Sequence, residues 1–128
     1  MFLVFVGLVG ACSPSKQTIP TINHVVFIKL DDPGDAGALM DDCDRLLPTI
    51  PGVHGYWCGQ HGEYGRPTVD GDYDVALYVG FTSGDEYATY VDHDNHVELV
   101  QSWKPKFEWI RVHDVVNRDH AMGTGYTE

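Results

Sequence analysis

The sequence predicts an α+β domain of the ferredoxin-like type, with the order β-α-β-β-α-β and one four-stranded antiparallel sheet. Three observations support this class. An apolar, β-branched run at residues 22–30 is followed by an apolar stripe of helical spacing at 36–50. An alternating, strand-like run occupies residues 73–81. A helical region at 83–104 and a last apolar run at 107–116 then complete the order.

The first half of the domain predicts a buried strand and an amphipathic helix. Residues 22–30 (INHVVFIKL) are apolar on both strand faces except at the ends, which is typical of a central strand. The residues DDPGDAG end this run and supply helix-start chemistry around Pro33. One helical face then carries Ala36, Leu39, Met40, Cys43, Leu46, Leu47 and Ile50. Pro48 and the Pro51-Gly52 pair are expected to end the helix.

The middle of the chain predicts two strands joined by a loop. Residues 53–60 form the shorter strand, which its glycines weaken. The loop that follows contains the turn signal Asp70-Gly71. From Tyr73 to Phe81 the side chains alternate with period two, which predicts a strand.

The second helical region has its own start signals. Ser83 to Glu86 forms a capping box, S-x-x-E, so a helix is expected from there to about His93. Asp94 or Asn95 is expected to cap a second helical segment, which ends before Pro105. A fourth strand at 107–116 follows, and residues 117–128 are expected to form a flexible tail.

Composition and charge narrow the class of function. The chain has 128 residues, of which 43% are hydrophobic and 21% charged, so one globular domain is expected. Its formal net charge of -11 argues against nucleic acid as a partner, because phosphate neutralisation needs clustered Lys and Arg. The same charge argues against electrostatic docking on anionic lipid and favours a solvated acidic surface.

The N-terminal segment predicts export. Residues 1–11 have the length of a signal-peptide apolar region and are too short to span a bilayer. The residues Val9-Gly10-Ala11-Cys12 resemble a bacterial lipobox, so we expect a lipidated Cys12 followed by a spacer at 12–21. No Lys or Arg precedes the apolar run, which leaves a start further upstream or a plain secretory signal as alternatives. The expected location is the periplasmic or cell-surface side of a membrane, with acyl chains as the anchor.

The strands of the predicted sheet indicate that both of its faces are covered. Both faces of the first and third strands are apolar, and a bare apolar sheet face is uncommon on monomers. A second copy is the simplest cover, so we expect a homodimer in which two sheets pair.

Of the remaining cysteines, Cys43 lies on the apolar helical stripe and is expected to be a buried free thiol. Cys43 and Cys58 alone are weak evidence for a disulfide.

Several short motifs resemble those of the Dabb family, the stress-responsive dimeric α/β-barrel domains. They are His24–Leu30 (HVVFIKL), Ile50–Val53 (IPGV), Tyr73–Leu77 (YDVAL) followed by Phe81 and Ser83, Tyr90-x-x-His93-x-x-His96, Trp103 and Val112-x-Asp114. They cover residues 22–116 in the family's order and spacing. The family usually has Pro after the first His of the pair, where this chain has Asp94, and both residues suit the start of a helical turn.

The resemblance implies a fold and a dimeric α/β barrel more firmly than an activity. The family includes polyketide cyclases such as olivetolic acid cyclase. In those enzymes a His on the first strand and a Tyr and a His from the second helical region line a cavity between helices and sheet. Carried over by motif position, the candidate catalytic residues here are His24, Tyr90 and His96.

The residues themselves support the same candidates. Two histidines beside a partly apolar cavity can serve as a general base and its partner near neutral pH, and Tyr90 can orient a carbonyl or phenol. Hydrogen-bonded structural histidines are the equal alternative for His24 and His96. His93, between two aspartates, is assigned to the turn. Val100 and Trp103 at i+4 and i+7 indicate that His96 lies over the sheet.

A metal site is a weaker alternative. His93 and His96 at i, i+3, with His24 and a carboxylate, could ligate a transition metal. The spacings of established zinc motifs are missing from the sequence, so no metal and no cofactor are predicted.

The sequence therefore predicts a homodimeric lipoprotein that binds a small apolar or aromatic ligand, with cofactor-independent, cyclase-like acid/base activity. A non-catalytic dimeric binding or structural module at the membrane is one alternative. A cofactor-free monooxygenase-like barrel is another.

Overall fold

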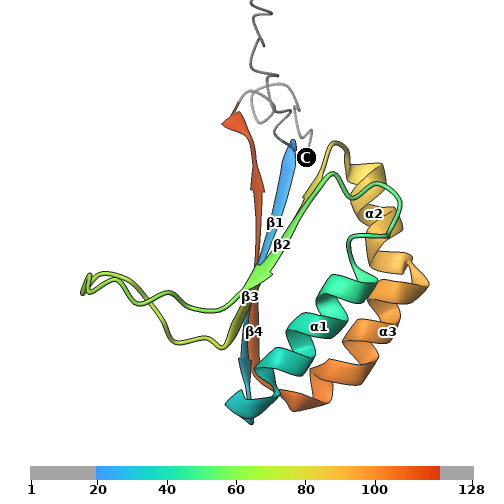
Figure 1. The fold of residues 1–128 in the computed structure, drawn as a ribbon. Helices are drawn as coiled ribbons and strands as arrows, with labels where there is room; N and C mark the ends of the chain where they lie inside the picture. Colours follow the sequence, from blue (N-terminus) through green and yellow to red (C-terminus); the bar gives the residue numbers. More distant parts are fainter. Residues whose placement is uncertain (1–19, 119–128) are drawn as a thin grey trace, which may run out of the picture.

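The computed structural model describes residues 20–118 and contains one four-stranded antiparallel sheet with the helices on one face (Figure 1). Its elements are β1 Ile22–Leu30, α1 Ala36–Leu46, β2 Gly55–Gly59, β3 Val75–Phe81, α2 Gly84–Asp92, α3 Asp94–Trp103 and β4 Phe107–Val116, with 3-10 turns at Pro33–Asp35 and Lys104–Lys106. This order confirms the ferredoxin-like fold. The predicted signal peptide and lipidated Cys12 lie outside the described residues, as does the tail from residue 119. Within residues 20–118, no helix combines the length and apolar composition needed to cross a bilayer.

Strand β1 lies inside the sheet, whose order is β2-β3-β1-β4. Its residues from Ile22 to Ile28 therefore have a neighbour on each of two strands. His24 faces Val79 of β3 on one side and Asp114 of β4 on the other. The register therefore places the side chains of His24, Val79 and Asp114 at one level of the sheet.

The core lies between the sheet and the helices. Alternate residues of β1 from His24 to Leu30 are buried, and the intervening ones are partly exposed. The helix layer supplies Leu39, Cys43 and Leu47 from α1 and its C-terminal end, all almost fully buried. The face of β1 assigned to the helices by its pattern is therefore the face they cover, and Cys43 is a buried free thiol as predicted.

Helix α1 is shorter than its apolar stripe. It ends at Leu46, whereas the periodicity predicts a helix as far as Ile50. Pro48 has no backbone N–H to continue the ladder, so the chain leaves the helix there. Ile50 is still buried, 2% exposed, because the turn that follows folds it back onto the core. The apolar spacing therefore predicted correctly that Ile50 is buried, but it was wrong that the helix extends to this residue.

The second helical region breaks at His93, which is the C-cap of α2 and the N-cap of α3. Its backbone is extended, and its side-chain Nδ1 accepts a hydrogen bond from the Asn95 N–H at 3.1 Å. The prediction that Asp94 or Asn95 caps this helix is wrong, because the N-cap is His93, whose imidazole nitrogen accepts the hydrogen bond from the free N–H of Asn95. The assignment of His93 to the turn is confirmed.

The opposite face of the sheet carries no helix within residues 20–118 (Figure 1). We call it the open face. Phe27 and the stacked pair Trp57 and Tyr78, with ring centroids 5.9 Å apart, lie on it. Residues 60–74, which join β2 to β3, extend away from the sheet on this side as an arm (Figure 1).

Candidate active site

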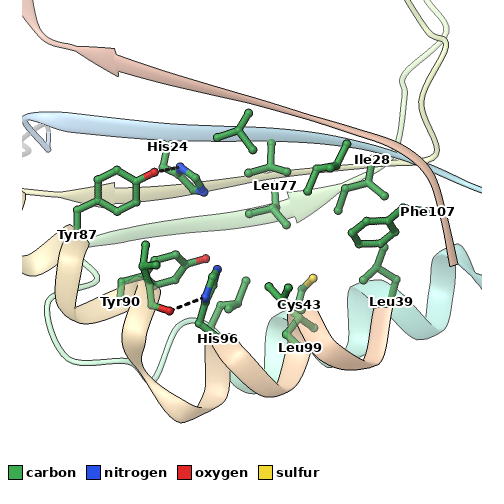
Figure 2. A pocket seen from close by; sticks show the side chains of 16 residues that line it. His24, Ile28, Leu39, Cys43, Leu77, Tyr87, Tyr90, His96, Leu99 and Phe107 are labelled. Carbon is green, nitrogen blue, oxygen red and sulfur yellow. Dashed lines mark hydrogen bonds between the residues drawn. The ribbon is translucent and has the colours of Figure 1, made fainter. Parts of the chain in front are cut away.

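A cavity of about 290 Å³ lies between the covered face of the sheet and the helices (Figure 2). Its side chains separate by kind. One end holds four polar or ionisable side chains: His24, Tyr87, Tyr90 and His96. The remaining wall is apolar and consists of Val26, Ile28, Leu39, Cys43, Leu47, Leu77, Val91, Leu99, Val100, Phe107, Ile110 and Val112. A ligand in this space would meet hydrogen-bonding groups at one end only.

The buried His24 and the more exposed Asp114 form a hydrogen-bonded dyad at the polar end. The Nδ1 atom of His24 lies 2.7 Å from Oδ1 of Asp114, its register partner on β4. Because an ionised carboxylate only accepts, Nδ1 carries a proton, and the tautomer that this contact selects has its lone pair on Nε2. His24 is 8% exposed, so water competes little for this nitrogen. The dyad presents a base to the cavity.

Tyr87 completes the network. Its hydroxyl donates to Oδ2 of Asp114 at 2.9 Å and lies 3.0 Å from Nδ1 of His24 (Figure 2). The carboxylate thus accepts from two donors and is held in one orientation. Burial, and then the hydrogen bond to Asp114, raise the pKa of Tyr87 above its usual range. Tyr87 therefore stays a neutral donor and positions Asp114.

Tyr90 lies between the two histidines. Its ring centroid is 6.0 Å from that of His24 and 4.6 Å from that of His96, and Phe81 packs against it at 5.0 Å. The residue is 2% exposed, and its hydroxyl points into the cavity (Figure 2). Burial raises the pKa of Tyr90, so the group is a neutral O–H donor at physiological pH.

His96 is held by a backbone group. Its Nδ1 lies 2.9 Å from the carbonyl oxygen of Val91, which can only accept, so Nδ1 carries the proton (Figure 2). Burial lowers the pKa of His96, and the neighbouring His24 adds to this effect. The ring is therefore neutral near pH 7 and offers Nε2 as an acceptor or weak base.

The structure brings His24, Tyr90 and His96 together around one cavity, as the sequence predicted. It adds Tyr87 and Asp114, which sequence reasoning missed. Tyr87 is three residues before Tyr90 on one helix, so helical spacing could have placed both side chains on the same face. Asp114 could have been found only by guessing the antiparallel register of β1 with β4.

The alternative metal site is not assembled. Nδ1 of His93 is engaged as the α3 cap. No group of three or more His, Cys, Asp or Glu side chains in residues 20–118 is arranged to hold a metal ion.

Comparison with known proteins identifies the family to which the chain belongs. The family model of the stress-responsive A/B barrel domain, Dabb, matches residues 22–117, so this chain belongs to the Dabb family. No curated protein matches the chain significantly.

Solved structures agree with this assignment. A Dabb family protein with a ferredoxin-like fold from Mesorhizobium loti is 25% identical, with a TM-score of 0.64 over 75% of this chain and 95% of that one. A dimeric ferredoxin-like protein of unknown function from Thermobifida fusca is 19% identical, with a TM-score of 0.63 over 75% and 90%. A hydroxynitrile lyase from Passiflora edulis is 17% identical, with a TM-score of 0.62 over 77% and 94%.

Proposed function

We propose that this Dabb domain binds a small apolar or aromatic ligand in the helix–sheet cavity and catalyses a cofactor-independent acid/base reaction on it. The observation that carries the proposal is the His24–Asp114 dyad, which leaves the lone pair of the buried imidazole on Nε2 in a cavity that Tyr90 also lines. The lyase from Passiflora edulis shares this fold, which is consistent with such chemistry without specifying a substrate.

The arrangement suits proton abstraction next to a carbonyl, or from a hydroxyl. Nε2 of His24 takes the proton, and Asp114 stabilises the resulting imidazolium through its Nδ1–H. The Tyr90 O–H donates to the substrate oxygen on which negative charge develops. His24 then returns the proton to carbon or to a leaving oxygen, so no external reagent is consumed. His96, neutral and in ring contact with Tyr90, positions that ring and can accept from a substrate hydroxyl.

The apolar wall defines the rest of the ligand. Leu39 and Phe107 lie far from the polar end (Figure 2), so the ligand's alkyl or aromatic body is expected there and its oxygen near Tyr90. Burial of that apolar body supplies most of the binding free energy, at about 25 cal/mol per Å² removed from water.

Hydrogen–deuterium exchange at the α-carbon of an aryl methyl ketone in D₂O, followed by NMR, tests the proposal without knowledge of the natural substrate. His24→Ala should slow the protein-catalysed exchange by about 10²–10⁴-fold. Asp114→Asn should slow it by a smaller factor. His61→Ala, a histidine in the arm, is the matched control and should leave the rate unchanged. Exchange in the His24→Ala variant as fast as in the unchanged protein would refute the assignment.

We also propose that two copies pair through the open face to form the dimeric barrel. The apolar and aromatic side chains there support this, and the Thermobifida fusca structure is described as dimeric. Sedimentation of the protein lacking residues 1–11 provides the test, and a monomer at micromolar concentration would contradict the dimer.

The lipid anchor is a further proposal and rests on the lipobox-like residues alone. If Cys12 is acylated, Cys12→Ser should release the protein from membranes into the soluble fraction. Unchanged membrane association of this variant would exclude the anchor.

A further inference from the structure

Two free thiols lie on the facing elements α1 and β2, and one of them lines the cavity. Cys43 of α1 is fully buried and lines the cavity (Figure 2), whereas Cys58 of β2 is partly exposed and packs against the core. The adjacent residues confirm that α1 and β2 meet at this level, because the Tyr56 hydroxyl donates to Oδ1 of Asp44 at 2.8 Å. Cys58 shares the covered face of β2 with Tyr56 and packs against the core cluster that contains Cys43.

The two sulfurs differ in reactivity. Interaction with the Cys43 thiol lowers the pKa of Cys58, although burial opposes this effect. The same interaction, followed by burial, raises the pKa of Cys43. Cys58 is therefore the thiol that ionises first and also the one nearer to solvent. These are the properties of an attacking cysteine beside a resolving one.

We propose that Cys43 and Cys58 form a reversible intramolecular disulfide that fixes α1 against β2 and thereby controls the wall of the ligand cavity. The oxidant is an external disulfide. The Cys58 thiolate attacks one of its sulfurs, forms a mixed disulfide and expels one thiolate. Cys43 then loses its proton, its sulfur attacks Sγ of Cys58, and the second external thiolate leaves. The protein loses two electrons and two protons, and the external disulfide becomes two thiols.

The bond would act on the cavity because the Cys43 side chain lies in the apolar wall, one helical turn from Leu39 and one from Leu47. In the reduced state α1 is held to β2 by packing and by the Tyr56–Asp44 hydrogen bond. A covalent bond at this point restricts how far α1 can move to admit a ligand. This consequence rests on the ligand-binding cavity proposed above, whereas formation of the bond does not.

The first measurement concerns the bond. The full chain carrying Cys12→Ser, which leaves only these two cysteines, is equilibrated with oxidised or with reduced glutathione. Oxidation should remove both thiols titrated after denaturation, lower the mass by two hydrogen atoms, and be reversed by dithiothreitol. In a Cys43→Ala background, glutathione should instead remain trapped on Cys58. Retention of both thiols, or a stable glutathione adduct on Cys58 when Cys43 is present, would overturn the proposal.

The second measurement concerns the cavity, with 8-anilinonaphthalene-1-sulfonate as the probe. Its dissociation constant should differ about fivefold or more between the oxidised and reduced forms. The exposed-side variant Cys58→Ser, which spares the buried position, should show no such difference. If the disulfide forms and the probe binds both forms equally, control of the cavity is refuted. If the reduced protein does not bind the probe at all, the ligand-binding proposal fails, while the thiol titration still decides whether the bond forms.

Discussion

The two faces of the sheet use the same strands in different ways. On the covered face, β1 buries His24, Val26, Ile28 and Leu30, each at most 8% exposed, against helices and cavity. On the open face, Trp57 is 49% and Val115 54% exposed in the single chain. Within residues 20–118 the helices all lie on one face (Figure 1). The covered face can therefore hold a site within one chain, whereas the open face would be buried only in the proposed dimer.

The polar groups of the two faces differ as well. On the covered face they converge on one end of the cavity and form the His24 network. On the open face they are spread out: Lys29 pairs with Asp72 of the arm, and the Arg111 guanidinium lies 4.1 Å above the Trp109 ring. Polar side chains that already have hydrogen-bond or ionic partners on a broad surface are typical of a protein–protein interface. Polar side chains that converge in an enclosed cavity are typical of a ligand-binding or active site.

The largest expected effect is loss of packing on the covered face. Phe81 is fully buried and stacks on Tyr87 with centroids 5.0 Å apart. Phe81→Ala should lower the free energy of unfolding by about 3–5 kcal/mol. Tyr64→Ala in the arm, where the ring is 89% exposed, removes an aromatic group of similar size and should change it by less than about 0.5 kcal/mol. Urea denaturation measures both, and equal effects would contradict the placement of the core.

The next effect concerns the open face. Phe27→Glu places a carboxylate among the aromatic side chains expected at the dimer interface. The dissociation constant of the dimer should rise by about 100-fold or more, because an unpaired charge would be buried there. Analytical ultracentrifugation over a concentration series measures this change. The exchange activity assigned to His24 should survive in the monomer if each cavity is complete within one chain, and a parallel loss would show that the two faces are coupled.

A smaller effect is expected from the acid titration of His96. Burial lowers its folded-state pKa, so the unfolded chain binds a proton more readily. Its contribution to the free energy of unfolding is present above the unfolded pKa of about 6.5 and is lost as pH falls below that value. His96→Gln should flatten this part of the stability profile. Urea midpoints at several pH values provide the measurement, and an unchanged slope in the variant would argue against a buried neutral imidazole.

The smallest effect is expected from Glu86 of α2, which accepts hydrogen bonds from His54 and Thr82 at the surface. Hydrogen bonds from His54 and from the backbone and hydroxyl of Thr82 lower the pKa of Glu86 to about 2. Its stabilising contribution is present above the ordinary value of 4.5 and is lost as pH falls through that value toward 2. Glu86→Gln should therefore reduce the acid dependence slightly between those limits. Thermal melts at pH 2, 4 and 6 would compare the variant with the unchanged protein, and identical profiles would count against this role of Glu86.

The sequence carried much of the site in local form. The spacing Tyr90-x-x-His93-x-x-His96, read with the family resemblance, selected two of the cavity's polar residues. The period of β1 placed His24 on the helix side. One half of the predicted capping box is present, because the Ser83 hydroxyl oxygen accepts a hydrogen bond from the Glu86 N–H. In place of the other half, the Glu86 carboxylate accepts from the N–H of Thr82 rather than from that of Ser83. These features depend on neighbours within one turn or on one strand, so they can be inferred along the chain.

What the sequence determined by itself was therefore the order of the elements, the buried face of each and three candidate residues, because periodicity and capping are local. Only the tertiary structure decided that Asp114 meets His24, that Tyr87 joins them, and that Cys43 lies beside Cys58. Each of these contacts depends on strand register or on how a helix lies across the sheet. Such placements follow from packing the whole core, and no short stretch of residues contains them.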